Sequence, residues 1–249
     1  MTLTNRIPSN DVRDVVRRLG TVVGVWAHPD DEAYLSAGLM AAAVEAGNRV
    51  VCVTATRGEH GTSDPTRWPP TRLAHARERE LQASLAALGV REHTWLPYHD
   101  GACAAVEPAE ATFMVRRVLD DIGADTVVTF GPDGMTGHPD HVAVGRWAAA
   151  AVAGARHRRR LLHATKTFGW GETHAELHRR LAIFGPEGPP AVERGRLALA
   201  LELRGDALDR KIAALLAHAS QTAELMAMMG EREYRTWAAD EYFVDARGG

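Results

Sequence analysis

The sequence is organised around residues 21–32, which read TVVGVWAHPDDE. The first seven of these residues are almost all apolar and predict a buried strand, and a helical pattern of apolar residues begins near Leu35. The polar residues between them therefore occupy a strand-to-helix turn, the place where an open α/β sheet binds its ligand. A dinucleotide-binding fold would place glycines at this turn, whereas this chain places an imidazole and three carboxylates there. Such a cluster suits a cation better than a pyrophosphate.

Strand and helix patterns alternate along most of the chain. Further buried strands are expected at residues 49–54, 94–96, 125–130 and 161–165, with amphipathic helices between them. This alternation predicts an α/β fold, a Rossmann-like, doubly wound, mostly parallel sheet with helices on both faces. The pattern weakens beyond about Thr167, where one more strand and two helices are expected. We therefore expect one domain over residues 1–249 with a decorated C-terminal third.

The composition argues against several kinds of partner. Charged residues make up 24% of the chain and the formal net charge is -3, so neither a nucleic acid nor a membrane surface is an expected partner. No stretch approaches the ~20 apolar residues of a membrane span, and no secretory signal is recognised. The two cysteines do not suggest a disulfide framework, so a cytoplasmic enzyme is expected. The basic run at 156–160 is expected to be a solvated loop.

A second motif, GHPDH at residues 137–141, follows another predicted strand. His28 and Asp31 are three residues apart, as are His138 and His141, which brings each pair to one side of a turn that enters a helix. Two imidazoles and one carboxylate with an open position form a recurring zinc site, which also fits Fe2+. The alternative is that the aspartates only cap helices. Because both motifs would lie at the carboxyl edge of one sheet, a metal site is the better interpretation.

The two histidine motifs resemble those of the PIG-L/LmbE-like family of zinc-dependent N-deacetylases. The similarity spans about residues 22–221, and its weaker matches are Thr56-Arg57-Gly58-Glu59, Arg77-x-x-Glu80-Leu81 and His218-Ala219-Ser220-Gln221. Carried over by position, the resemblance implies three metal ligands, namely His28, Asp31 and His141. It also implies Asp30 as the general base and His138 as the residue that assists the oxyanion or the leaving group.

These implied roles agree with the chemistry of amide hydrolysis. Zinc lowers the pKa of a bound water to ~7 and polarises the amide carbonyl. Asp30 can then take the proton of the water and deliver it to the departing amine. We expect His138, as an imidazolium, to stabilise the tetrahedral oxyanion. Asp140 is expected either to hold His138 in one tautomer or simply to cap its helix.

Two further residues are candidates for substrate binding. Arg77 lies on the apolar side of its predicted helix, so either it points into the cleft toward the substrate or it pairs with Glu80 or another carboxylate. Asp100 follows the third strand, and both its position and the resemblance make it a candidate ligand of a sugar hydroxyl rather than a turn-former.

Four other polar residues have no settled role in the sequence. We assign none to Glu32, while His218 and Gln221 either line the pocket or belong to a capped helix junction. Thr136 stands two residues before His138 of the second motif, where some family members that act on glucosaminyl-inositol substrates have a tyrosine. This difference argues against a direct transfer of that substrate.

The sequence as a whole predicts a zinc-dependent hydrolase that removes an N-acyl group, with acetyl as the first candidate. Its partner would be a small-molecule N-acylated amino sugar or glycoside, and a homo-oligomer is left open. One alternative is a zinc amidase acting on a non-sugar amide, such as a thiol conjugate or an antibiotic acyl chain. Another is a non-catalytic binding protein of the same fold.

Overall fold

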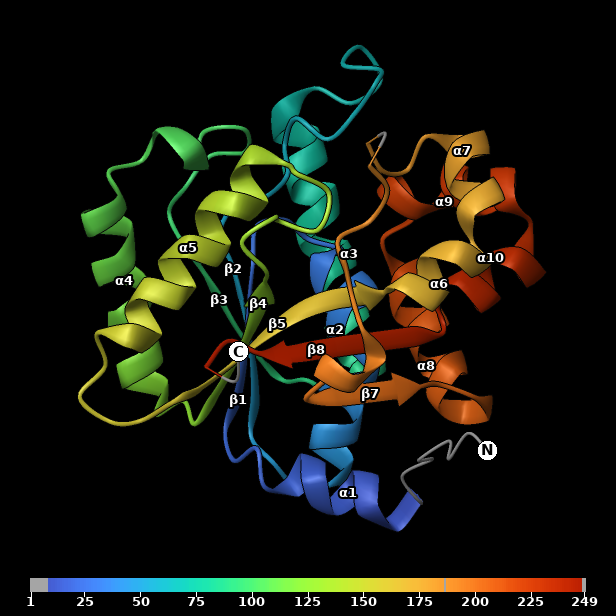
Figure 1. Ribbon diagram of the computed structural model, residues 1–249. Helices are drawn as coiled ribbons and strands as arrows, with labels where there is room; N and C mark the ends of the chain where they lie inside the picture. The colour runs from blue at the N-terminus through green and yellow to red at the C-terminus, as the bar shows by residue number, and fades with distance from the viewer. Residues whose placement is uncertain (1–8, 186, 248–249) are drawn as a thin grey trace.

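The computed structural model describes residues 9–185 and 187–247. Its strands are β1 (Val22–Trp26), β2 (Val50–Thr54), β3 (Glu92–Trp95), β4 (Thr126–Phe130), β5 (Arg160–Thr167), β6 (Ala191–Val192), β7 (Leu199–Glu202) and β8 (Asp240–Asp245). They form a sheet in the order β3-β2-β1-β4-β5-β8-β7, and the short β6 pairs with β5 (Figure 1).

The helices of the described residues fall between these strands or follow them. They are α1 (Ser9–Arg17), α2 (Asp31–Glu45), α3 (Pro70–Leu88), α4 (Pro108–Ile122), α5 (Pro139–Ala153), α6 (Phe168–Thr173), α7 (Ala175–Leu181), α8 (Gly205–Ala217), α9 (Ala219–Met229) and α10 (Glu231–Ala238). Helices α2, α3 and α8 pack together on one face of the sheet, and α4 and α5 pack together on the other (Figure 1). None of these helices is both long and apolar enough to cross a lipid bilayer.

The first five strands run parallel, which confirms the predicted doubly wound α/β fold. Their order reverses between β1 and β4, because β2 and β3 extend the sheet on one side and β4 and β5 extend it on the other. Such a reversal is where open α/β sheets bind ligands. Both histidine motifs follow the two strands at this point, so the topology brings them to the same edge.

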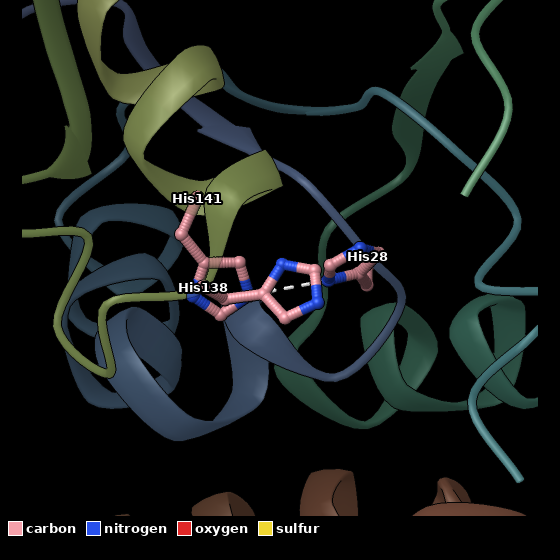
Figure 2. Close-up of side chains that lie close together, drawn as sticks. All are labelled: His28, His138 and His141. Carbon is pink, nitrogen blue, oxygen red and sulfur yellow. Dashed lines mark hydrogen bonds between the residues drawn. The ribbon is translucent and has the colours of Figure 1, made fainter. Parts of the chain in front are cut away.

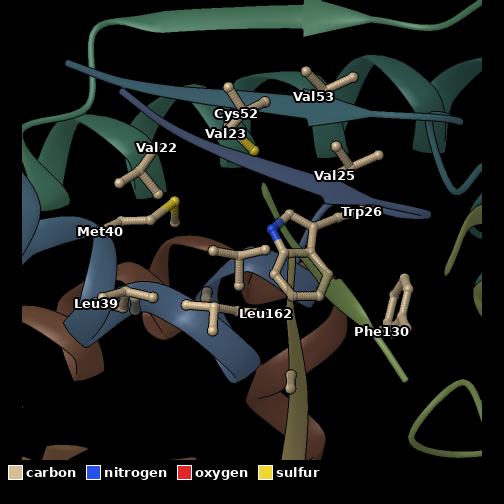
Figure 3. Close-up of a cluster of buried hydrophobic side chains, with 14 of the residues drawn as sticks. Val22, Val23, Val25, Trp26, Leu39, Met40, Cys52, Val53, Phe130 and Leu162 are labelled. Carbon is tan, nitrogen blue, oxygen red and sulfur yellow. The ribbon is translucent and has the colours of Figure 1, made fainter. Parts of the chain in front are cut away.

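The centre of the sheet is buried on both faces. Every residue of β1, β2 and β4 is buried, as expected for valine-rich parallel strands covered by helices. Trp26 and Phe130 meet edge to face with ring centroids 5.0 Å apart, and Leu39 and Met40 of α2 pack beneath β1 (Figure 3). This core fixes the carboxyl ends of β1 and β4 relative to each other.

The structure differs from the sequence prediction at several elements. Helix α2 begins at Asp31, several residues before the predicted start, because Asp31 and Glu32 occupy its first turn, where acidic side chains are favourable. The sequence analysis missed α1, α6, α7, α10 and the antiparallel strand β8, whose partners β5 and β7 are distant in sequence.

The expectation that residues 156–160 form a solvated loop is wrong for the last two residues, because Arg160 is the first residue of β5 and Arg159 is buried. Arg159 is buried, donates to the carbonyl of Ala124 and pairs with Asp120. Its guanidinium thus connects the end of α4 to the start of β5, a contact between segments about 40 residues apart that local sequence does not reveal.

Candidate metal and active site

Two histidine motifs meet at the carboxyl edge of the sheet. His28 follows β1, whereas His138 caps α5 and His141 lies in its first turn. The three imidazoles converge, with ring centroids 5.0–5.1 Å apart (Figure 2). Nδ1 of His28 lies 3.1 Å from Nε2 of His141.

The Asp31 carboxylate completes the predicted ligand set. Its Oδ1 lies 3.4 Å from Nε2 of His141, and its Oδ2 lies 3.8 Å from Nδ1 of His28. A tetrahedral ion with ligand bonds of 2.0–2.2 Å would separate its ligand atoms by roughly 3.3–3.6 Å. The donor types and their spacing therefore fit a zinc-sized cation. The backbone N–H of His28 donates to Asp31 Oδ2 at 2.8 Å and so fixes this carboxylate.

The hydrogen bonds of His28 and His141 leave one ring nitrogen of each free to bind a metal at the centre of the site. His141 donates from Nδ1 to the carbonyl of Gly134 at 3.0 Å, so its Nε2 keeps a free lone pair toward the centre. Its ring also stacks on Phe130 at 4.3 Å. Nε2 of His28 lies 3.0 Å from Asp100 and 3.2 Å from Asp140, which places a proton on that nitrogen and directs Nδ1 to the centre. Partners of this kind orient metal-binding histidines.

Two further groupings of potential metal-binding side chains occur among the described residues, and both include His28. One adds His138 and His141, and the other adds Asp100 and Asp140. In the second grouping the carboxylates face a ring nitrogen that carries a proton, so they serve His28 rather than an ion. Burial alone lowers the pKa of His28, but the hydrogen bonds to Asp100 and Asp140 outweigh it and raise this pKa to about 10.

The structure corrects the prediction for Asp140. Its carboxylate is buried and accepts hydrogen bonds from the backbone N–H groups of Gly101 and Cys103 at 2.7 and 3.1 Å. The Asp140 carboxylate therefore contacts His28. It neither fixes the tautomer of His138 nor caps α5. The cap is the ring of His138, whose Nδ1 accepts from the backbone N–H of Asp140 at 3.2 Å.

The same contact corrects the expected charge of His138. A nitrogen that accepts a hydrogen bond carries no proton, so the ring is neutral with its proton on Nε2. Burial, followed by the charges of His28 and His141, lowers the pKa of His138. An imidazolium at this position is therefore disfavoured, and His138 offers a neutral N–H donor instead.

Asp30, the predicted base, is held in an unusual backbone conformation. Its φ is +112°, a region that residues other than glycine seldom adopt, and its N–H donates to Glu32 at 2.9 Å. Its carboxylate lies 3.4 Å from the guanidinium of Arg77. Burial raises the pKa of Asp30 to about 6, and the charge of Arg77 opposes that rise. These neighbours therefore hold the side chain of the predicted base in position.

Arg77 lies in the site rather than in solvent. It is buried, donates to the carbonyl oxygens of Pro29 and Gly58, and pairs with Asp30. The predicted alternative partner, Glu80, accepts from Ser220 instead. A Cβ at Gly58 would lie 2.3 Å from Nη1 of Arg77, so this glycine leaves the room that the guanidinium needs.

Sequence reasoning missed a buried ion pair behind the base. Nε2 of His218 lies 2.7 Å from Oε1 of Glu32, and the hydroxyl of Ser84 donates to the same oxygen. The other oxygen, Oε2, accepts from the backbone of Asp30. Burial raises the pKa of Glu32, but the charge and hydrogen bond of His218 outweigh it and lower this pKa, while the pKa of His218 is raised. Glu32 and His218 thus support the strained Asp30.

A cavity of about 460 Å³ opens above these residues. Its polar side includes Arg77, Asp100, Thr136 and Gln221, and the hydroxyl of Thr136 lies 3.3 Å from Nδ1 of His141. Its other side is contributed largely by the C-terminal third of the chain. The apolar residues on that side are Tyr34, Leu35, Ile183, Phe184, Leu225 and Trp237.

The fold and the site define an α/β enzyme class with a candidate metal centre at the topological reversal of the sheet. The PIG-L family model, described as GlcNAc-PI de-N-acetylase, matches residues 23–152. A Kineococcus radiotolerans protein named 1D-myo-inositol 2-acetamido-2-deoxy-alpha-D-glucopyranoside deacetylase is 32% identical over 247 residues, covering 80% of this chain and 68% of that protein. The chain belongs to this family of metal-dependent deacetylases and is itself a deacetylase.

Other similar proteins agree with this assignment. A Bacillus anthracis protein named as a probable N-acetyl-alpha-D-glucosaminyl L-malate deacetylase 2 is 29% identical, covering 86% of each chain. The structure of an N,N'-diacetylchitobiose deacetylase from Pyrococcus horikoshii matches with a TM-score of 0.63 at 21% identity, covering 96% of this chain and 88% of that one. A zinc-inhibited teicoplanin deacetylase structure matches with a TM-score of 0.62 at 17% identity, covering 92% of this chain and 100% of that one. These structures confirm the fold.

Proposed function

We propose that this protein is a zinc-dependent N-deacetylase that acts on a small N-acetylated amino-sugar glycoside. The two relatives with the names given above share an N-acetylglucosaminyl group and differ in the aglycone, inositol in one and malate in the other. The shared half of these substrates is therefore the part we carry over to this chain. Thr136 still argues against a direct transfer of the inositol aglycone.

One observation carries the proposal. Nδ1 of His28 lies 3.1 Å from Nε2 of His141, and the Asp31 carboxylate approaches both nitrogens, with Oδ2 3.8 Å from His28 and Oδ1 3.4 Å from His141. We propose these three side chains as the residues that hold the ion. When bound, zinc polarises the amide carbonyl and acidifies a water molecule. Fe2+ fits the same donor set, so zinc is the first choice by ligand type and family.

We assign the proton transfers to Asp30. Its carboxylate takes a proton from the attacking water, and the same proton passes to the amine nitrogen as the C–N bond breaks. The products are the free amine and acetic acid, which ionises to acetate by releasing the second proton of the water, and the base is restored. Arg77 and the backbone contact with Glu32 hold Asp30 in place for both transfers.

His138 and Asp100 complete the proposed site. The neutral Nε2–H of His138 would donate to the oxyanion that develops on the amide oxygen. Asp100 contacts His28 through Oδ1 and accepts from the backbone of His60 through Oδ2, and the remaining lone pairs of its carboxylate can accept a sugar hydroxyl. Arg77 is retained as a residue of the cavity wall, with substrate contact still a prediction.

We also propose the setting in which the enzyme works. The sheet combines strands from the N-terminal and C-terminal thirds of the chain, which supports one domain over residues 1–249. Cys52 and Cys103 are free and buried, which is in keeping with action in the reducing cytoplasm.

A substrate panel with metal-defined protein tests the function. Protein loaded with zinc or with Fe2+ is incubated with N-acetylglucosaminides, thiol-conjugated amides and N-acyl antibiotics, and the release of free amine is measured. We expect N-acetylglucosaminides to be the preferred class. A preference for the non-sugar amides would replace the proposed substrate class. Zinc-loaded protein that releases no amine from any substrate would favour a binding protein instead.

A further inference from the structure

The chain contains two lysines among its 29 lysine and arginine residues, and both are buried. Lys211 has a clear counter-charge, because its Nζ lies 2.7 Å from Oε1 of Glu241 and also donates to the carbonyl of Tyr34. That pair joins α8 to β8 and α2. Apart from the histidines, all other basic side chains are arginines, so Lys211 is one of two lysines in the chain, and its ion pair with Glu241 gives it a structural role.

Lys166 on β5 differs from Lys211 in its partners. Its Nζ donates to the carbonyl of Asp240 at 3.1 Å and lies 4.3 Å from the ring centroid of Trp170. Among the described residues, no carboxylate lies within ion-pair distance of this amine. An ammonium group has three donors, so this contact set leaves donors for another partner. Burial, with a smaller contribution from Lys211, lowers the pKa of Lys166 to about 7.

Lys166 lines the same cavity as the candidate metal ligands. Its amine lies over the ring of Trp170, whose centroid is 6.3 Å from that of Phe184 and 6.0 Å from that of Trp237, and both of these aromatic residues line the cavity. Leu35 follows Asp31 by four residues on α2, so the apolar wall begins about one helical turn, roughly 5–6 Å, from a candidate ligand. The cavity thus has a polar end at the metal centre and an apolar end with one amine.

An acetyl group is too small to occupy both ends. Its single methyl group accompanies the scissile carbonyl at the metal centre, so the apolar end must receive a part of the substrate that remains on the amine. A buried cation without a counter-charge is costly, and an ion pair formed between apolar walls is stronger than one in water. Glu241 and Asp240 act on Lys166 only from beyond ion-pair distance, so a ligand anion would supply the direct partner that the described residues do not place beside this amine.

We infer that the Lys166 end of the cavity binds the aglycone of the glycoside, and that this aglycone carries a carboxylate or phosphate group that pairs with Lys166. The inference rests on the proposed function, because it assumes an N-acetylglucosaminide at the metal centre. A purely structural role for Lys166, as a link between β5 and β8, would affect stability and leave substrate preference unchanged.

Matched aryl glycosides test this assignment. The 4-carboxyphenyl, 4-phosphophenyl and 4-methylphenyl glycosides of N-acetylglucosamine share one ring and differ in charge. Amine release by the zinc-loaded enzyme gives kcat/KM for each. We expect one or both anionic substrates to exceed the methyl analogue by about tenfold to a hundredfold. Lys166→Met should reduce that ratio to about one, whereas Lys166→Arg should retain most of it.

Binding of the deacetylated glycosides, measured by calorimetry, separates this inference from the proposed function. Tighter binding of the anionic products without turnover would contradict the deacetylase assignment and keep the anion site. Turnover of all three substrates with equal kcat/KM by the wild-type enzyme would overturn the anion site and keep the deacetylase. A ratio that survives in Lys166→Met would also overturn it, and the wild-type comparison decides the matter if that variant does not fold.

Discussion

His28 and His141 lie 113 residues apart in the chain, yet Nδ1 of one is 3.1 Å from Nε2 of the other. Each ring directs its second nitrogen to an oxygen, His28 to the carboxylates of Asp100 and Asp140 and His141 to the carbonyl of Gly134. The two facing nitrogens must therefore share a proton or a cation. Without a metal, the raised pKa of His28 means that a proton lies between the two nitrogens. When a metal binds, the cation takes the place of that proton.

Removal of a ligand and removal of the base should have different consequences. His141→Ala should lose both the bound metal and activity, since it deletes one of three ligands. Asp30→Ala should keep the metal and lower kcat by about 10²–10⁴-fold, the usual contribution of general base catalysis. Elemental analysis after dialysis, together with amine release, measures both effects. An Asp30→Ala enzyme that retained most of its kcat would show that the base is another group.

His138→Gln distinguishes an oxyanion donor from a metal ligand. As a donor, His138 should be dispensable for the metal, and its loss should lower kcat by about 10²–10³-fold. If His138 is a metal ligand, its substitution should lower the metal content together with the activity. Metal titration of the variant beside its kinetics reports which role the ring has, and a marked loss of affinity would refute the assignment made here.

Asp140→Asn tests the carboxylate behind His28. The asparagine keeps the size of the side chain but weakens the acceptor for Nε2 of His28. Loss of such a partner typically lowers metal affinity by 10–100-fold, which a competition assay with a chelator can measure. Because Asp140 holds His28 rather than His138, kcat at saturating metal should change much less than affinity. An unchanged affinity would show that Asp100 is sufficient.

Glu32→Gln should destabilise the fold. The substitution removes one partner of a buried ion pair, a change that costs about 3–5 kcal/mol while the other partner stays charged. His218 has a raised and Glu32 a lowered pKa in the folded protein, so the pair contributes fully between their unfolded values of 4.5 and 6.5. Its contribution declines as the pH rises through the folded pKa of His218 or falls through that of Glu32.

The free energy of unfolding, measured by denaturant titration at several pH values, should therefore differ most between wild type and Glu32→Gln from pH 4.5 to pH 6.5. The double variant Glu32→Gln/His218→Gln is the control, and it should recover part of the loss because no charge remains buried. A difference that stayed constant as the pH rose would speak against a charged His218.

Gly58→Ala should impair catalysis through Arg77. The new Cβ would lie 2.3 Å from Nη1 of Arg77, so the guanidinium must move away from Asp30. We expect kcat/KM to fall about tenfold or more while the metal content is unchanged. Gly47→Ala is a matched control, because Gly47 has a similar positive φ but no atom within 4 Å of its added Cβ. Equal kinetic effects in both variants would implicate backbone strain instead.

Local patterns were sufficient to predict the strands and helices of the first two thirds of the chain. Valine-rich strands buried on both faces and amphipathic helices between them have distinct periodicities, so β1 to β5 and α2 to α5 were found at close to their true places. Helices α6, α7 and α10 are short and mix polar with aromatic residues. Strand β8 depends on pairing with β5 and β7, and such pairing is not encoded locally.

The sequence by itself determined the α/β fold, the two motifs that face each other and the family to which the chain belongs. Those features follow from the order of residue types along the chain. Only the tertiary structure decided which nitrogen of each histidine is free, that Asp140 serves His28, and that Glu32 pairs with His218. It also placed Lys166 in the cavity of the metal centre. These contacts join segments far apart in the chain, and side-chain direction and burial, which set them, exist only once the sheet and its covering helices have packed.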